Sequence, residues 1–238
     1  MTDKILKTLV LLIGTFITLK AVGIAEEIEK GLYGYWSFDE GKGEITLDKS
    51  ENANHGIVHG AKWVKGKSGY ALEFDGVDDY VDCGKNTAIK GKELTISLWI
   101  KFLSEPSKVN AHIVCRNYYL GFWGKRENPV YFSFYVGGKN FAGMMAGKEY
   151  RFVKGKWYHI AATYDYDIAE MRIYVNGECI ATHDEARLIV AGNPNKPLRI
   201  GTGDGGAHFK GIVDEVRIYN RALSADEIKS LYENFNRN

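Results

Sequence analysis

Apolar and polar side chains alternate with a period of two along most of the chain, which is the pattern of β-strands buried on one face. The segment Thr95–Phe102 shows the pattern most clearly, because its even-numbered residues are all apolar. The residues between them fall on the opposite face of the expected strand. The same reasoning predicts strands at Tyr131–Val136, Trp157–Tyr164, Met171–Val175 and Glu178–Ala181.

A tight hairpin is predicted between the last two of these segments. Only Asn176 and Gly177 separate them. A two-residue type I′ turn needs positive φ at both central residues, and Asn followed by Gly adopts this conformation readily. We therefore expect these two strands to pair antiparallel.

A short helix is predicted near the end of the chain. Ser224 and Glu227 have the spacing of a capping box, in which each side chain accepts a hydrogen bond from the other residue's backbone amide. Leu223 and Ile228 are placed to pack against each other across the start of this helix. We expect the helix to cover residues from Ala225 to about Asn234.

Strands throughout and one short C-terminal helix predict an all-β fold, a two-sheet antiparallel sandwich or jelly roll. The 238 residues include 27 Gly and only 4 Pro, and 13% are aromatic, a composition that favours strands joined by tight turns. No Pro/Ser-rich linker, charge block or repeat of fixed period divides the chain, so one domain is expected.

The charge balance restricts the class of partner. The formal net charge is +1, whereas a protein that binds nucleic acid needs a basic surface to neutralise phosphates. With 45% apolar and 26% charged residues, the chain is also neither disordered nor collagen-like. Nucleic acid is therefore excluded as the main partner.

The first residues have the layout of a secretory signal peptide. Lys4 and Lys7 precede the mostly apolar run Thr8–Leu19, and small residues follow at Gly23–Ala25. A helix of this run spans about 18 Å, which is short of the roughly 30 Å hydrocarbon core of a bilayer. We expect residues 1–25 to be a signal peptide and residues 26–238 to form a secreted, periplasmic or cell-surface domain. The alternative is an uncleaved anchor that continues to Ala25.

Three cysteines, Cys83, Cys115 and Cys179, are far apart in the sequence and lie in strand-like segments. Three small buried thiols are the simplest interpretation. An oxidising compartment also allows one disulfide, and the sequence leaves all three pairings open.

Seven motifs follow one another along the chain: GYWSFDEG at 34–41, DKSENANHG at 48–56, ALEFDGVDDYV at 71–81, LTISLWI at 94–100, GKWYHIA at 155–161, IYVNG at 173–177 and GIVDEVRIYNRALS at 211–224. In this order they resemble the laminin-G-like jelly rolls of the concanavalin A-like lectin/glucanase superfamily. The resemblance extends over Leu32–Phe235 and implies a jelly roll in which the first and last strands lie side by side. The same fold hosts lectins, adhesion modules and enzymes, so it does not identify a function.

A structural calcium ion is predicted from Asp214. Alternation within Ile212–Ile218 places Asp214 on the same face as Ile212, Val216 and Ile218. An ionised carboxylate that faces an apolar layer is costly unless it is paired, and Ca²⁺ is suited to carboxylate and carbonyl oxygens. The alternative is that Asp214 pairs with an arginine or caps a loop.

The resemblance supplies the remaining ligands of this metal site, because related jelly rolls commonly hold a structural Ca²⁺ between the first and last strands. Asp39, Asp48 and Asp214 match the positions expected of such a site. The alternative is that Asp39 and Asp48 only form turns. No transition-metal site is expected, since His55 and His59 are the one close histidine pair and no cysteine accompanies them.

Catalytic residues are not predicted. Glu73 and Asp75 alternate on one strand face with Asp78 just beyond, which faintly resembles the acid spacing of glucanases of the same fold. The full set of three alternating acids is absent, and Asp75 also begins a turn in the laminin-G-like motif. A polysaccharide-acting hydrolase, which needs two carboxylates across a cleft, is therefore the third hypothesis.

Ligand binding without catalysis is the favoured hypothesis. Sugars are held by aromatic faces and by planar polar side chains, and these groups are concentrated in the segment 116–123 and in the polar loop 201–208. We predict an exported carbohydrate- or glycoconjugate-binding module, or alternatively a protein–protein adhesion or scaffold domain that binds other extracellular proteins. The predicted ligand-binding residues are Arg116, Tyr118, Trp123, Asp204 and His208.

Overall fold

The computed structural model describes residues 27–85, 89, 91–106, 110–116, 118–123, 130–136, 140–146, 150–184, 187, 189–190, 195–203 and 206–235, without the side chains of 110, 123, 130–136 and 140–146. The chain divides into two compact units, Met1–Gly31 and Leu32–Asn238, and every described strand belongs to the second. The expected signal peptide lies outside the described residues. Within the described part of the chain, no helix combines the length and apolarity needed to cross a membrane.

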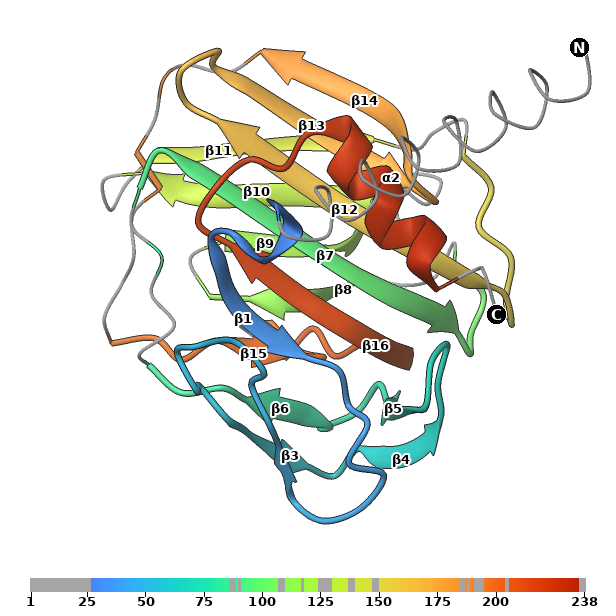
Figure 1. Ribbon diagram of the computed structural model, residues 1–238. Coiled ribbons are helices and arrows are strands. Elements are labelled where there is room, and N and C mark those ends of the chain that lie inside the picture. Colours follow the sequence, from blue (N-terminus) through green and yellow to red (C-terminus); the bar gives the residue numbers. More distant parts are fainter. Residues whose placement is uncertain are drawn as a thin grey trace, which may run out of the picture. The chain divides into compact units, whose positions relative to one another are not determined.

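Two antiparallel sheets, each with eight described strands, form the unit Leu32–Asn238 (Figure 1). The first sheet has the order β14 (Glu178–Asp184), β13 (Glu170–Val175), β12 (Trp157–Asp165), β7 (Glu93–Phe102), β16 (Lys210–Tyr219), β5 (Tyr70–Asp75) and β4 (Lys62–Lys65), and β1 (Leu32–Trp36) also pairs with β16. The second has the order β11 (Asn140–Ala146), β10 (Val130–Val136), β9 (Tyr118–Trp123), β8 (Asn110–Cys115), β15 (Arg199–Ile200), β6 (Tyr80–Asp82), β3 (Gly56–His59) and β2 (Ile45–Thr46). The predicted all-β sandwich is confirmed.

The central strand β7 shows why these residues form a sandwich. Its even-numbered apolar residues are buried in the core between the sheets, as the alternation predicts. Its opposite face is also buried, because helix α2 (Ala225–Asn234) crosses that face of the first sheet (Figure 1). The ring of Trp99 on this face lies 5.6 Å from the ring of Tyr232 on the helix. The first sheet is thus covered on both sides at β7.

Aromatic side chains join the two sheets. The ring of Phe102 in β7 lies 4.8 Å from that of Phe122 in β9 and 5.6 Å from that of Phe152, in edge-to-face arrangements. Each such pair contributes about 0.5–1.5 kcal/mol beyond the burial of its surface. The cluster therefore ties strands of different sheets, far apart in the sequence, into one core.

The predicted hairpin is confirmed. Asn176 and Gly177 connect β13 to β14 with φ values of 52° and 80°. A side chain at Gly177 would also press against Tyr232 of α2, with 3.1 Å from its Cβ to the nearest ring atom. The turn therefore needs glycine both for its conformation and for the approach of the helix.

The predicted helix is confirmed as α2. Ser224 Oγ accepts from the Glu227 amide at 3.3 Å, and the Glu227 carboxylate accepts from the Ser224 amide at 2.8 Å. Arg221 also donates to both carboxylate oxygens of Glu227, at 3.1 and 2.6 Å. Leu223 and Ile228 are buried at the start of the helix. A reciprocal cap of this kind stabilises a helix start by about 1 kcal/mol.

The three cysteines are free thiols, and their burial corrects one expectation. Cys83 and Cys115 are buried as expected. Cys179 is exposed, so the interpretation of three buried thiols is wrong for this residue. The reason is its place in β14, which lies at the edge of the first sheet and is mostly exposed along its length.

A buried histidine lies between the first sheet and α2. The imidazole of His159 in β12 has its Nε2 atom 2.8 Å from Ser97 Oγ and its ring 5.4 Å from that of Trp99. Burial, together with the positive charge of Arg217 nearby, lowers its pKa to about 3. The neutral imidazole is therefore the form that the folded protein accommodates.

This histidine predicts a loss of stability in acid. The unfolded chain takes up the proton near the ordinary pKa of 6.5 and the folded protein only near 3, so stability falls as the pH drops through that window. Because of this histidine, the free energy of unfolding measured in urea should be about 3 kcal/mol smaller at pH 4 than at pH 7.5. The variant His159→Asn should weaken this pH dependence. The exposed-residue control His183→Gln should keep it, and an unchanged dependence in His159→Asn would contradict the account.

Candidate functional site

A β-bulge in β16 determines where its acidic residues point. The pairing of β16 with β7 shifts register between Asp214 and Arg217, and Glu215 has a φ of 55°. Val213 and Val216 both lie in the core as a result. The bulge inserts one residue into the alternation, so the prediction that Asp214 shares a face with Val216 and Ile218 is wrong. Asp214 is nevertheless fully buried.

The carboxylate of Asp214 is only half satisfied by protein donors. Its Oδ2 atom accepts hydrogen bonds from the amides of Lys67 at 2.8 Å and Ser68 at 3.2 Å. Its Oδ1 atom is buried and has no hydrogen-bond partner among the described residues. Burial, followed by the negative charge of Glu215, raises the pKa of Asp214 to about 8. The ionised carboxylate of Asp214 is therefore only partly compensated by its hydrogen bonds.

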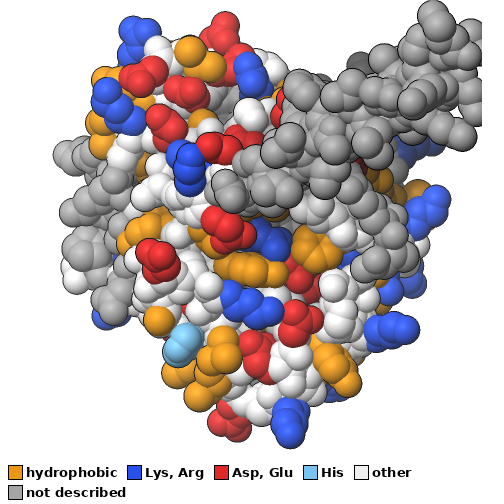
Figure 2. Space-filling model, in the orientation of Figure 1, with side chains coloured by type: hydrophobic (Ala, Val, Ile, Leu, Met, Phe, Trp, Pro, Cys, Tyr) orange, Lys and Arg blue, Asp and Glu red, His pale blue; other side chains and the backbone are white. Residues whose placement is uncertain are grey.

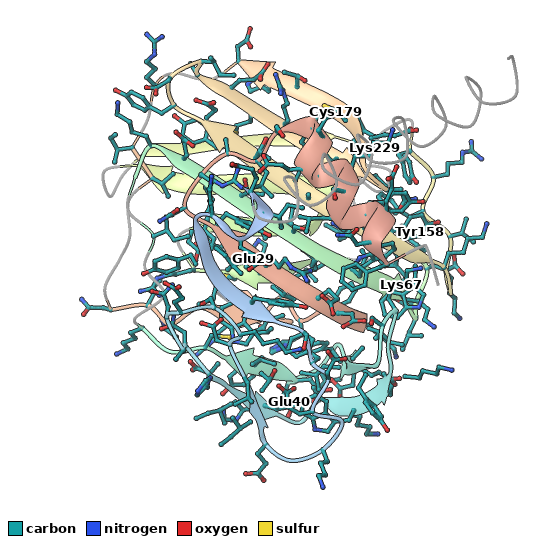
Figure 3. All side chains as sticks on the ribbon, viewed as in Figure 1. Glu29, Glu40, Lys67, Tyr158, Cys179 and Lys229 are labelled. Atoms are coloured by element: carbon teal, nitrogen blue, oxygen red, sulfur yellow. The ribbon has the colours of Figure 1, made fainter. Side chains whose placement is uncertain are left out.

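Asp39 also lies next to this loop. The loop connects β4 to β5, and Lys67 lies in it beside β16 (Figure 3). Asp39 Oδ1 accepts from the Tyr70 amide at 3.4 Å, and Asp39 Oδ2 forms an ion pair with Lys49 at 3.1 Å. Asp39 also adds to the negative potential at Asp214. The structure thus brings two of the three predicted metal ligands to one loop.

Oxygen atoms converge beside Gly66 in this loop. A Cβ atom at Gly66 would lie 2.6 Å from Asp214 Oδ2, 2.6 Å from the Ser68 carbonyl oxygen and 2.7 Å from the Tyr70 carbonyl oxygen. Carboxylate and carbonyl oxygens are the ligands that Ca²⁺ takes. Together with the unpartnered Oδ1 of Asp214, this donor set fits a hard cation.

Asp48 has a different place from the other two. Its carboxylate accepts hydrogen bonds from the amides of Tyr35, Ser50 and Asn54, all between 2.8 and 2.9 Å, and from the Ser50 hydroxyl at 2.9 Å. These bonds hold the turn that follows it against β1. The side chain therefore acts as a turn residue, which is the alternative considered for it.

Sequence reasoning did not identify the buried pair next to Asp214. Glu215 accepts from the Tyr35 hydroxyl and from Arg217, both at 2.8 Å. The guanidinium carbon of Arg217 lies 3.9 Å from the centre of the Tyr35 ring. Burial raises the pKa of Glu215, whereas Arg217 and Tyr35 favour its charged form. The contacts of Tyr35 with this pair fasten β1 to β16. No local motif signals them, because Tyr35 and the pair come from opposite ends of the domain.

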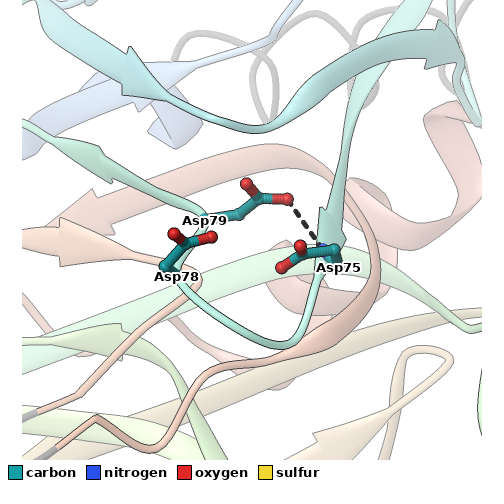
Figure 4. A group of neighbouring side chains, drawn as sticks. All are labelled: Asp75, Asp78 and Asp79. Atoms are coloured by element: carbon teal, nitrogen blue, oxygen red, sulfur yellow. Dashed lines mark hydrogen bonds between the residues drawn. The ribbon is translucent and has the colours of Figure 1, made fainter.

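A second acidic group lies in the loop between β5 and β6 (Figure 4). Ligand atoms of Asp75, Asp78 and Asp79 all lie within 4.8 Å of one another. Asp79 Oδ2 accepts from the Asp75 amide at 2.8 Å, and Asp75 Oδ1 accepts from the Val77 amide at 2.7 Å. Backbone amides, that of Val77 first, lower the pKa of Asp75. An acid held in its charged form does not suit the proton-donating role that hydrolysis requires.

The structure describes the side chains of three of the five predicted ligand-binding residues, Arg116, Tyr118 and His208. Arg116 is buried and donates to the Lys85 carbonyl oxygen at 2.6 Å, and Tyr118 lies in the core, so both are interior groups. His208 is half-buried and lies near Asp75. The side chain of Trp123 and residue Asp204 lie outside the described part of the structure.

A stacked group on the second sheet was also missed. The rings of His59 in β3 and Tyr80 in β6 stack with centroids 4.4 Å apart. Arg199 in β15 lies over the Tyr80 ring at 5.0 Å, and its Nε atom is 3.9 Å from Asp82 Oδ2. The alternation of each strand places these residues outward, but only the strand pairing, which sequence patterns do not reveal, brings them together.

Comparison with known proteins identifies relatives of the fold. Residues 75–229 match the family model Laminin_G_3, described as the concanavalin A-like lectin/glucanases superfamily. The mouse pentraxin-related protein PTX3 is 26% identical over 124 residues, which cover 45% of this chain and 32% of that protein. The chain therefore corresponds to about a third of the length of this curated relative.

Solved structures share the sandwich at low identity. Domain 4 of AbnA, an extracellular arabinanase of Geobacillus stearothermophilus solved in complex with arabinotriose, has a TM-score of 0.65 and 18% identity over 84% of this chain and 98% of that one. The binding domain of Paraclostridial Mosquitocidal Protein 1 has a TM-score of 0.70 and 16% identity, over 88% of this chain and 53% of that one. The botulinum neurotoxin serotype G binding domain has a TM-score of 0.67 and 12% identity, over 87% and 51%. These likenesses show a common fold.

The crowding at Gly66 predicts a position-specific loss of stability. The substitution Gly66→Ala forces a methyl group against three oxygens and should lower the free energy of unfolding by about 2 kcal/mol. The matched control is Gly91→Ala, since a Cβ there meets nothing within 4 Å. Urea unfolding measures both variants. Equal stability of the two would contradict the described arrangement of the loop.

Proposed function

The chain belongs to the concanavalin A-like lectin/glucanases superfamily, and from this we propose that it is a non-catalytic carbohydrate-binding module. The observation that supports the proposal most strongly is the likeness to domain 4 of AbnA. That domain is solved with arabinotriose, and this chain spans 98% of it. Among the solved structures named above, it is the one that this chain matches over nearly its full extent.

The surface is consistent with a neutral ligand rather than a polyanion. On the face drawn in Figure 2, acidic and basic side chains are interspersed, with separate apolar groups between them. A protein that binds a phosphate backbone instead presents a positively charged surface. The formal net charge of +1 agrees with this distribution.

Protein recognition is the second candidate function. Ile45 and Ile57 face each other across β2 and β3, are 55% and 53% exposed, and lie beside the 46% exposed Leu47. Clustered apolar side chains on a surface often mark a protein interface. The likeness to a pentraxin-related protein and to toxin binding domains supports the same candidate.

A structural calcium ion completes the proposal. Asp214 and Asp39 supply carboxylate oxygens and the loop Gly66–Tyr70 supplies carbonyl oxygens, with Asp48 outside the set. A bound Ca²⁺ would supply the positive charge that the buried Asp214 carboxylate lacks. The chain's own residues hold the loop against β16 through the two amides that bind Asp214. The ion therefore has a stabilising rather than a catalytic role.

The proposed location is extracellular. The predicted signal peptide at residues 1–25 supports it, and the arabinanase that contains the similar domain is itself extracellular. Millimolar Ca²⁺ outside cells would keep a site of modest affinity filled. Secretion and calcium binding are thus mutually consistent parts of the proposal.

Removal of calcium should destabilise the protein. At a hundredfold excess of Ca²⁺ over Kd, the ion contributes about 2.7 kcal/mol to the free energy of unfolding. Thermal unfolding should therefore occur at lower temperature in chelator than in Ca²⁺. Asp214→Asn should remove this difference, and the exposed control Asp167→Asn should retain it. Identical melting curves with and without chelator would refute the calcium site.

Glycan binding tests the main function. The full chain should bind oligosaccharides on a printed glycan array and should bind arabinotriose, the sugar found with domain 4 of AbnA, in calorimetry. Incubation with the bound polysaccharides should release no reducing ends. A protein that binds no glycan but captures a glycan-free extracellular protein would instead support the second candidate.

A further inference from the structure

The outer face of the second sheet carries an ordered group of polar and aromatic side chains. Strand pairing places Ile57 opposite Asp82, His59 opposite Tyr80, and Asp82 opposite Arg199. The residues that alternate with them, Val58, Val81 and Ile200, are buried in the core. His59, Tyr80, Asp82 and Arg199 therefore point away from the core, on three adjacent strands.

The aromatic part of this group is held in a fixed geometry. The His59 and Tyr80 rings are 18° from parallel, with their centroids 4.4 Å apart. The Arg199 guanidinium lies over the Tyr80 ring at 5.0 Å. His59 is exposed and Tyr80 is half-buried, so the imidazole presents a flat surface to solvent above a supported tyrosine. Such contacts fix the rings before any ligand arrives, which lowers the entropic cost of binding.

The polar part of the group combines a partly exposed guanidinium with a fixed carboxylate. Arg199 Nε is itself buried and makes no hydrogen bond to any residue that the structure describes, and it is 3.9 Å from Asp82 Oδ2, too far for one. The exposed part of the guanidinium is therefore the part that a ligand can reach. Asp82 Oδ1 accepts from the Gly84 amide at 2.8 Å, which fixes the carboxylate. The side chains of Arg199 and Asp82 are 42% and 28% exposed. A planar donor and a planar acceptor thus lie side by side with balanced charge.

We propose that His59, Tyr80, Asp82 and Arg199 form the sugar-binding site of this protein and take a neutral oligosaccharide. This inference rests on the proposed carbohydrate-binding function and locates it. The C–H face of a pyranose or furanose ring packs on the exposed imidazole of His59, which the Tyr80 ring supports from below, while vicinal hydroxyls donate to Asp82 and accept from Arg199. The balanced Asp82–Arg199 pair favours uncharged sugars over acidic ones, since a carboxylate on the ligand would be placed beside Asp82.

Calorimetry with arabinotriose and with neutral and sialylated array glycans tests the site. His59→Ala, Tyr80→Leu and Arg199→Gln should each weaken binding of the neutral glycan by about tenfold or more, because each removes a ring contact or a charge-assisted hydrogen bond. The matched control is Tyr166→Leu, since Tyr166 also has a cation over its ring, Lys92 at 4.7 Å. This control should bind as the wild type does. Melting curves verify that each variant is folded.

The outcomes separate this site from the function on which it rests. A wild-type protein that binds no glycan overturns both the site and the carbohydrate-binding function. A wild-type protein that binds a neutral glycan, with folded His59→Ala and Arg199→Gln variants of unchanged affinity, overturns the site and leaves the function standing. Binding confined to sialylated glycans overturns the neutral specificity. The proposal is supported if these variants lose neutral-glycan binding while the control Tyr166→Leu keeps it.

Discussion

Two adjacent carboxylates, Asp214 and Glu215, are buried in β16, which pairs with β1, β5 and β7 at the centre of the first sheet. A buried charge without a partner costs several kcal/mol, so the sheet depends on how these two are compensated. Glu215 is met by Arg217 and by the Tyr35 hydroxyl. Asp214 accepts hydrogen bonds from two backbone amides, and its other oxygen has no partner in the part of the chain that the structure describes. This asymmetry is the physical reason for assigning a cation to Asp214 and none to its neighbour.

The bulge at Glu215 makes this arrangement compatible with the core. By adding one residue, it lets Val213 and Val216 both face the core while the two acids lie outside it. The acids then reach β1 and the loop Gly66–Tyr70, which belong to the first third of the chain. The stabilising groups thus lie at the first sheet, whereas the proposed sugar site lies on the second.

The features predicted correctly from sequence have local causes. The hairpin depends on two residues, the helix start on a capping box, and β7 on simple alternation. The features predicted wrongly depend on tertiary context. The face of Asp214 was reversed relative to Val216 by a bulge, and Cys179 is exposed because its strand lies at an edge. Likewise, only the pairing of β3, β6 and β15 assembles the stacked group around Tyr80.

The most direct test of this account is the stoichiometry of Ca²⁺ binding, measured by titration calorimetry on the chelator-treated full chain. The arrangement of Asp39, Asp214 and the carbonyl oxygens around Gly66 predicts one ion per chain, and none after Asp214 is replaced by asparagine. Absence of calcium binding, or binding of one ion that survives this replacement, would contradict it. In either case the buried carboxylate of β16 would have to be compensated by some other means.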